Sequence, residues 1–144
     1  MERGKLARSF DWKEFTKSDV AKAHHINNEM VDWEVRDNIK ALVDNVLQPL
    51  RDAWGGPIFI NSGYRCKELN ELVGGVETSQ HRRGMAADCG VTDPYALAKL
   101  AIKMKLPYDQ LILYPSFTHI SFRPDGKNRG QVLYNKKWRG PKDL

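Results

Sequence analysis

The chain has little cysteine, no long apolar run and no internal repeat, and each absence excludes a class of protein. Two cysteines, Cys66 and Cys89, are too few for a disulfide framework, and they do not form a CxxC pair. We therefore expect free thiols. No apolar run approaches the ~20 residues that span a bilayer, so no membrane-spanning segment is predicted.

The composition is that of one soluble globular domain. The chain has 144 residues, of which 41% are hydrophobic and 28% are charged, a size and balance that allow a real core. The first eight residues carry positive charge, but no apolar segment follows them, so no secretory signal is visible. We expect one domain over residues 1–144, in a protein that is cytoplasmic as synthesised.

The charge balance points to an anionic partner. A formal net charge of +5 favours encounter with a polyanion, which could be nucleic acid, an anionic membrane or a bacterial cell wall. Nucleic acid is the least supported, because the chain has neither an interleaved aromatic and basic stretch nor a known binding motif. From about residue 123 the chain is polar and basic, and this tail is either solvated or a basic surface for anionic wall polymers.

The longest periodic pattern predicts the principal core helix, over roughly 30–53. Apolar residues recur there on one helical face; they are Val35, Ile39, Leu42, Val43, Val46 and Leu50. Pro49 lies inside the pattern, where it either kinks the last turn or is tolerated by packing. Gly55, Gly56 and Pro57 end the helix.

Shorter elements precede and follow this helix. Further helical segments are predicted over 9–28 as a lid of short helices, over 66–72 and over 94–104. β-rich apolar runs predict strands over 57–61, 85–91, 108–114 and 117–122, the last two as a hairpin. The pattern predicts an α+β fold with a small, mainly antiparallel sheet and helices packed on one face.

The stretch SQHRRGMAAD, at 79–88, places His81 and Asp88 seven residues apart. Catalytic zinc takes three protein ligands such as His, Asp, Glu or Cys and leaves one position for water. His119 is the best third candidate, because a buried unpaired imidazole in an apolar strand would be costly. From spacing alone another interpretation stays open, with a surface histidine at 81, a hydrogen-bonded core histidine at 119 and a capping aspartate at 88.

The motif SxHxxGxAxD, followed by a strand-borne histidine at 119, resembles the zinc D-alanyl-D-alanine carboxypeptidase-like peptidases. That family includes cell-wall carboxypeptidases, vancomycin-resistance dipeptidases and phage endolysins. Further matches are INSGYR at 60–65, VGGV at 73–76 and YDQLI at 108–112, so the resemblance covers roughly residues 10–135. It implies a hedgehog/D,D-peptidase-like fold, with the zinc site on one face of the sheet and the long helix on the other.

The resemblance also implies roles for single residues. His81, Asp88 and His119 would hold Zn²⁺. Arg65, in the SGYR motif, would steady the oxygen that gains charge during amide hydrolysis. Two further residues each have two possible roles: Ser79 would contact substrate or cap its own loop, and Asp109 would act in catalysis or brace a zinc-binding histidine.

The sequence departs from the family at the general base. Many members carry Glu or Asp three residues before the last ligand, where it takes a proton from zinc-bound water; here that position is Ser116. Asp109 is the nearest upstream carboxylate, but on a hairpin it would lie toward the far end from the turn. Tyr114 and two acids of the N-terminal lid, Glu14 and Asp19, are further candidates for the role.

Two hypotheses follow from these residues. The leading one is a zinc peptidase that cleaves the peptidoglycan stem peptide, either as a D,D-carboxypeptidase or as an endolysin-type endopeptidase acting on the wall after phage-type release. The other is a catalytically inactive zinc-containing module that binds the wall or a protein, as hedgehog-signalling relatives suggest. The expected cofactor is Zn²⁺ and the expected state is a monomer. Which stem-peptide bond is cut stays open at this point.

Overall fold

The long helix predicted over about 30–53 is present, with a π-helical turn in its middle. In the computed structural model, which describes residues 5–30 and 32–144, α3 (Trp33–Leu42) continues through η1 (Val43–Leu47) into α4 (Gln48–Trp54). Position 31 of the predicted range lies outside the described residues. The π turn ends two residues before Pro49, whose nitrogen has no hydrogen to donate to the preceding turn. The proline is accommodated where the helical pitch changes.

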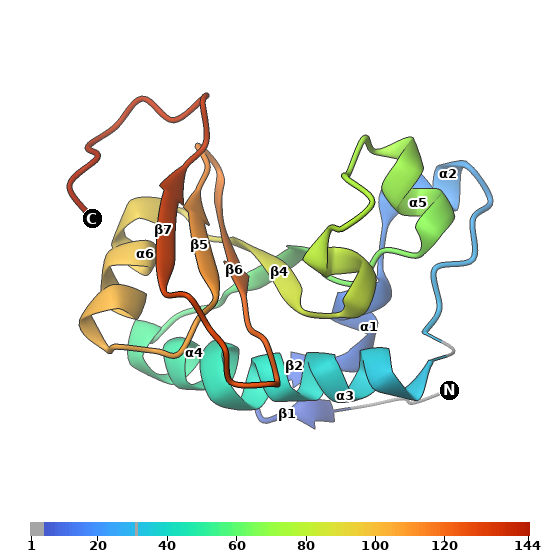
Figure 1. Cartoon of the computed structure of the whole chain (residues 1–144), viewed down its shortest axis with the longest axis horizontal. Helices are drawn as coiled ribbons and strands as arrows, with labels where there is room; N and C mark the ends of the chain where they lie inside the picture. The colour runs from blue at the N-terminus through green and yellow to red at the C-terminus, as the bar shows by residue number, and fades with distance from the viewer. Residues whose placement is uncertain (1–4, 31) are drawn as a thin grey trace.

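The predicted apolar face of this helix forms the base of the core. Its six periodic residues are all buried, from Val35 at 8% exposure to Leu50 at 0%. They belong to one cluster with Leu97 of the last helix and with Leu111 and Ile120 of the sheet. Burying each such side chain contributes about 1.5–3 kcal/mol. Figure 1 shows the helix running along the base of the molecule, below the strands.

The main sheet is mainly antiparallel, as predicted. Its strands are β3 (Phe59–Ser62), β4 (Ala86–Gly90), β5 (Gln110–Leu113), β6 (Phe117–Ser121) and β7 (Gln131–Tyr134). Their order across the part of the chain that the structure describes is β3-β4-β6-β5-β7, and the β5–β7 pair is parallel. β5 and β6 form the predicted hairpin. The fold is therefore α+β.

β7 is a strand that the sequence did not predict, inside the segment expected to be a polar tail. Its backbone continues the ladder with β5, since Gln131 N donates to Asp109 O and Asn135 N donates to Leu113 O, both at 2.9 Å. The run QVLY is short and stands among basic residues, so it carries a weak local signal. Its pairing depends on β5, which tertiary structure alone brings beside it. The basic segment is thus built into the sheet as far as Tyr134.

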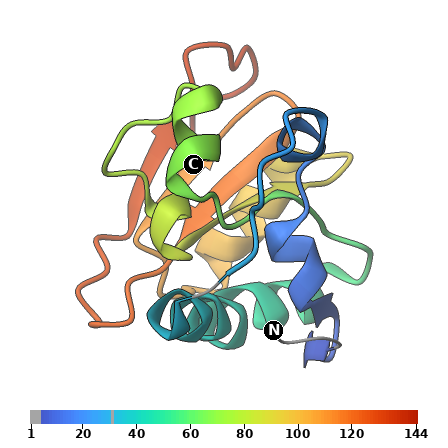
Figure 2. The same cartoon turned by 90° about the vertical axis from the view of Figure 1, so that its right-hand side faces the viewer.

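The N-terminal lid covers the opposite edge of the sheet, as Figure 2 shows. Its short helices are α1 (Trp12–Thr16) and α2 (Asp19–Ala23). The strand pair β1 (Lys5–Ala7) and β2 (Phe10–Asp11), which was not predicted, lies beside the long helix at the base of the molecule. The Asn28 side chain donates to the carbonyls of Thr16 and Tyr64 and accepts from Cys66 N. That single amide holds the lid against the chain that follows β3. His24 and His25 are exposed.

Three shorter helical segments complete the described chain: α5 (Lys67–Leu72), the 3-10 turn η2 (Gln80–Arg83) and α6 (Pro94–Lys103). Asp93 caps α6 by accepting from Ala96 N, and Pro94 lies in the first turn. Thr118 of β6 donates to the Pro94 carbonyl and fixes α6 against the sheet. Among residues 5–30 and 32–144, no helix has the length and apolar character needed to span a membrane.

Gly84 ties the 79–88 stretch to the long helix. It has φ of 74°, and a Cβ there would lie 2.6 Å from the carbonyl oxygen of Val35. Gly126 has a similar φ of 82° with nothing within 4 Å of the same position. An alanine at either position would be strained by the positive φ. Only at position 84 would its Cβ also clash with packed neighbours.

We expect Gly84→Ala to lower the free energy of unfolding by about 2–5 kcal/mol, as left-handed strain adds to overpacking. The matched control, Gly126→Ala, should lose only about 1–2 kcal/mol, from strain alone. Urea unfolding followed by circular dichroism measures both. Equal losses in the two variants would contradict the packing role of Gly84.

Candidate metal centre

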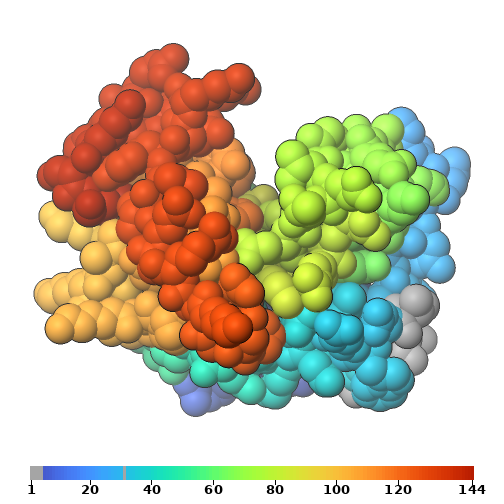
Figure 3. Space-filling model, viewed as in Figure 1, coloured from blue at the N-terminus to red at the C-terminus, as the bar shows by residue number. Residues whose placement is uncertain are grey.

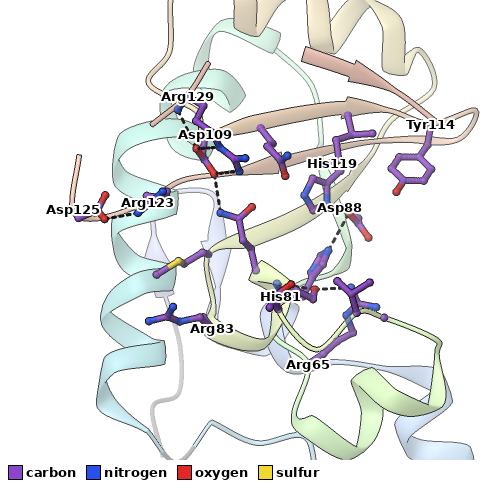
Figure 4. A pocket seen from close by; sticks show the side chains of 18 residues that line it. Arg65, His81, Arg83, Asp88, Asp109, Tyr114, His119, Arg123, Asp125 and Arg129 are labelled. Carbon is purple, nitrogen blue, oxygen red and sulfur yellow. Dashed lines mark hydrogen bonds and ion pairs between the residues drawn. The ribbon is translucent and has the colours of Figure 1, made fainter. Parts of the chain in front are cut away.

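The three predicted ligands lie together in the middle of one face of the sheet. Asp88 of β4 and His119 of β6 are direct partners across the antiparallel pair, and Nδ1 of His119 lies 2.9 Å from Oδ1 of Asp88. Nε2 of His81, from η2, lies 3.3 Å from the same oxygen. One ligand atom from each residue lies within 4.8 Å of the other two. Figure 4 shows the three side chains turned toward one another.

Strand geometry explains why Asp88 and His119 share a face. Residues directly opposed on an antiparallel pair point to the same side, and their neighbours point to the other side. Cys89 therefore faces the core, where burial raises the pKa of its thiol, and it points away from the site. Thr118 and Ile120, which flank His119, are likewise fully buried.

A backbone carbonyl decides which nitrogen of His81 faces Asp88. Nδ1 lies 2.7 Å from the carbonyl oxygen of Gly63, which only accepts, so Nδ1 carries a hydrogen. In the neutral imidazole, Nε2 then directs a lone pair at the Asp88 carboxylate, which also only accepts. Two acceptors 3.3 Å apart repel each other unless a cation lies between them or the imidazole takes a second proton. A metal ion satisfies both groups.

The donor atoms suit zinc in kind and in spacing. Ligand bonds of about 2.1 Å in a tetrahedron place ligand atoms roughly 3.4 Å apart, close to the 2.9 and 3.3 Å found here. Burial opposes ionisation of Asp88, but the close contacts with His119 and His81 outweigh it and hold the pKa of this carboxyl below its usual range. The carboxylate is therefore charged. Two imidazoles and one carboxylate fit a catalytic zinc site with a position left for water.

The triad opens into a cleft. The cavity has a volume of about 660 Å³, and its walls come from η2, β5, β6, Arg65 and the segment 123–129. Figure 3 shows the surface hollowed between the β5–β7 side, in orange and red, and the α5 side, in green. The proposed ligands are thus reachable from solvent although His81 itself is buried.

Residues 11–121 match the family model described as Peptidase M15. The match covers more than half of the chain and contains the whole triad. The chain belongs to the peptidase M15 family. The family resemblance of the 79–88 motif is thereby confirmed. A comparison with curated proteins finds no match.

Arg65 lies beside the triad of this M15 chain. Its backbone N donates to the His81 carbonyl at 3.1 Å, which joins the SGYR segment to the ligand turn. Its Nη2 lies 3.5 Å from Ser79 Oγ, a long contact. In the described part of the chain the buried Nε has no hydrogen-bond partner. Burial lowers the pKa of the guanidinium although Asp88 opposes the shift, so a cation with unused donors faces the cleft.

Ser79 performs the capping role, one of the two that the sequence allowed. Its Oγ accepts from His81 N at 3.3 Å at the start of η2. It also lines the cleft, so a contact with substrate stays a prediction beside the capping bond.

Asp109 is buried at the end of β5 away from the hairpin turn, as expected. Its carboxylate accepts from the backbone N, Nε and Nη2 of Arg129 at 3.0, 2.9 and 2.8 Å, and from Nε2 of Gln80 at 2.9 Å. The bonds from Arg129 and Gln80 outweigh burial and hold its pKa at about 2. Within the described residues its bonds reach the triad through Gln80, the neighbour of His81, rather than through a histidine ring.

The missing acid is not replaced at position 116. Ser116 lies in the hairpin turn and lines a separate cavity near Phe59. Besides Asp88, the carboxylates of described residues that line the cleft are Asp109 and Asp125, and each is paired with an arginine.

The remaining candidates for the general base differ in position. Glu14 accepts from Asp11 N at 2.7 Å and closes a helix cap. Asp19 lines a second cavity that also contains Arg65 and Asp88. Tyr114 lines the cleft itself, and burial raises the pKa of its phenol, so it stays a proton donor. Asp19 is therefore the candidate base that the geometry favours, and Tyr114 is placed to donate a proton.

Sequence reasoning missed three contributors to the site. The Gly63 carbonyl orients His81, and no sequence signal marks a backbone acceptor. Gln80 and Arg129 hold Asp109, and Arg129 was grouped with the basic tail. The sequence signal for Gln80 was its place beside a ligand inside the 79–88 stretch.

If the triad holds zinc, wild-type protein should carry one zinc per chain, and the double variant His81→Ala, His119→Ala should carry almost none. His24→Ala, His25→Ala is the matched control, because it removes two exposed histidines outside the site. Elemental analysis by mass spectrometry after desalting gives the ratios. Stoichiometric zinc in the first double variant would show that the site is misplaced.

The carboxylate of Asp109 should stabilise the fold in a pH-dependent way. Its pKa of about 2 is below the ordinary value of about 3.9, so its stabilisation is complete above pH ~4 and is lost as pH falls toward 2. We expect Asp109→Asn to cost roughly 1–3 kcal/mol at neutral pH, and the cost to shrink on acidification.

Chemical unfolding of metal-free protein between pH 7 and pH 2.5 measures this difference without interference from zinc release. Asp125→Asn, which removes an exposed ion pair with Arg123, is the control and should cost under about 1 kcal/mol. A cost for Asp109→Asn that does not change with pH would contradict the ionic role.

Proposed function

We propose that this M15 chain is a zinc-dependent peptidase that cleaves a peptide bond in the peptidoglycan stem peptide. The observation that carries the proposal is the His81, Asp88 and His119 cluster at the floor of a cleft that also contains Arg65. M15 is a family of metallopeptidases. The proposal extends this to a single domain over residues 1–144, with a hedgehog/D,D-peptidase-like arrangement, that works as a monomer.

A zinc ion held by the triad lowers the pKa of a bound water toward neutrality and polarises a carbonyl oxygen. The residues of the chain supply the rest. Gly63 fixes the His81 ring so that Nε2 faces the site. Arg65 offers unused donors to an oxygen that gains charge, and its rigid planar fork suits that task. Asp109 holds the η2 turn in place through Gln80.

The proposed substrate is anionic or zwitterionic peptide in the wall rather than nucleic acid. Arginines 65, 83, 123 and 129 all line the cleft, and stem peptides carry free carboxylates. Action on the wall requires that the protein reach it, and phage-type release is the route that the family resemblance suggests.

A second candidate is a zinc-containing module that binds the wall or a protein without cleaving it. It is favoured by one observation, the serine at 116 where many relatives carry an acid, in a turn that lines another cavity. The presence of Asp19 and Tyr114 near the site favours catalysis instead.

Incubation of zinc-loaded protein with purified peptidoglycan and with stem pentapeptide, followed by mass analysis of the products, tests the proposal. A mass loss of one terminal D-alanine indicates a carboxypeptidase, and internal fragments indicate an endopeptidase. Binding to the wall with no product in either assay would favour the second candidate.

Arg65→Ala should reduce turnover about 10²- to 10³-fold, the usual cost of one lost oxyanion donor, with KM and zinc content changed little. The interaction strengthens only as charge builds on the oxygen, so binding in the ground state loses less. Arg65→Lys keeps the positive charge but lacks the planar guanidinium, so its turnover should lie between those of wild type and Arg65→Ala. Arg51→Ala, on α4, is the control. Full turnover in Arg65→Ala would refute the role.

A further inference from the structure

The triad lies between two cavities. The cleft already described contains His81, His119, Arg65 and Asp88. A second cavity of about 330 Å³ shares Arg65 and Asp88 with it and contains no triad histidine. Both volumes lie in the range of about 300–1,000 Å³ that is usual for ligand sites. The two cavities therefore meet at the metal centre.

Strand register places these cavities on opposite sides of β4. Four residues form a row across the sheet, because Ser62 pairs with Asp88, Asp88 with His119, and His119 with Ile112. The first cleft covers the His119 and Ile112 end of the row, and the second cavity covers the Ser62 end. A groove across the strands thus passes over Asp88 near its middle.

The second cavity shares lining residues with a further cavity at the β3 edge of the sheet. Its outer wall is the segment from the end of α1 into the first turn of α2, with Lys17, Ser18, Asp19 and Val20. Three of these residues, with Asn61, also line a further cavity of about 250 Å³ that reaches Phe59. β3 is an edge strand, and Phe59 is 64% exposed there. The path therefore continues from the metal centre to the rim of the sheet.

From this geometry we propose that the substrate chain extends past the metal centre on both sides, so that the enzyme is an endopeptidase. The proposal rests on the proposed zinc peptidase function and assigns the cleaved bond to the interior of the peptide rather than to its C-terminal end. A carboxypeptidase needs a cavity that ends one residue beyond the cut bond. Here the substrate residues beyond the cleaved bond lie over Ser62 and Asn61, beneath the 17–20 segment. They leave the protein over Phe59.

The first experiment compares stem pentapeptide in two forms, one with free ends and one acetylated at the N-terminus and amidated at the C-terminus. We expect internal cleavage of both, with kcat/KM values within about threefold of each other. Loss of one terminal residue from the free peptide, with the capped peptide intact, overturns the inference and leaves the peptidase function standing. No cleavage of either peptide or of purified peptidoglycan overturns both.

The second experiment fills the β3-side cavity. Val20 is 41% exposed and lines it, so Val20→Trp should raise KM for the capped peptide at least tenfold and leave zinc content unchanged. Val73→Trp, also exposed at 42% in the same cavity, gives an independent test if the first variant folds poorly. Leu72→Trp is the matched control, because Leu72 is 45% exposed on α5 and lines neither cavity.

Binding supplies a readout that does not depend on turnover. Titration calorimetry of metal-free protein with the capped pentapeptide should show weaker binding in Val20→Trp and Val73→Trp than in wild type or Leu72→Trp. Unchanged KM and unchanged affinity in both cavity variants would show that substrate does not enter the β3-side cavity, and would overturn the inference.

Discussion

The Asp88 carboxylate is the group around which this site is arranged. It lies on a central strand, it is opposed by His119 in the β4–β6 register, and it faces Nε2 of His81 because the Gly63 carbonyl occupies the other ring nitrogen. The strands of the sheet and the η2 turn thus converge on one oxygen. A buried carboxylate between two imidazoles is costly without a proton or a cation to share. Zinc binding would turn that cost into stabilisation of the fold.

A second buried carboxylate connects this centre with the C-terminal part of the chain. Asp109 directly precedes β5, accepts from Gln80 beside His81, and is enclosed by Arg129 just before β7. The last strand, the hairpin and the ligand turn are therefore held by one ionic group. This explains why the basic segment is built into the sheet as far as β7. It also assigns to Arg129 a role in positioning the site, where composition suggested only a charged surface.

The departure at position 116 changes which part of the protein completes the chemistry. In this chain the hairpin turn supplies a serine, and the cleft carboxylates at 109 and 125 are already paired with arginines. The groups left beside the triad are the Tyr114 phenol and, across Arg65, the Asp19 carboxylate of the lid. If the lid acid serves, the N-terminal helices contribute to catalysis as well as to the wall of the β3-side cavity. The lid would then couple substrate length to turnover.

The sequence by itself determined the helix face from Val35 to Leu50, the strands β3 to β6 with their hairpin, and the family, because each depends on local periodicity or on short motifs. His119, 31 residues after Asp88, was identified as the third candidate ligand from its apolar strand and from the family resemblance. The tertiary structure alone decided the pairing of β7 with β5, the orientation of His81 by a backbone carbonyl, and the partners of Asp109. It also decided that two cavities meet at Asp88. These features join residues far apart in the chain, and long-range contacts leave no periodic trace in the sequence, since they form only when separate elements pack against one another.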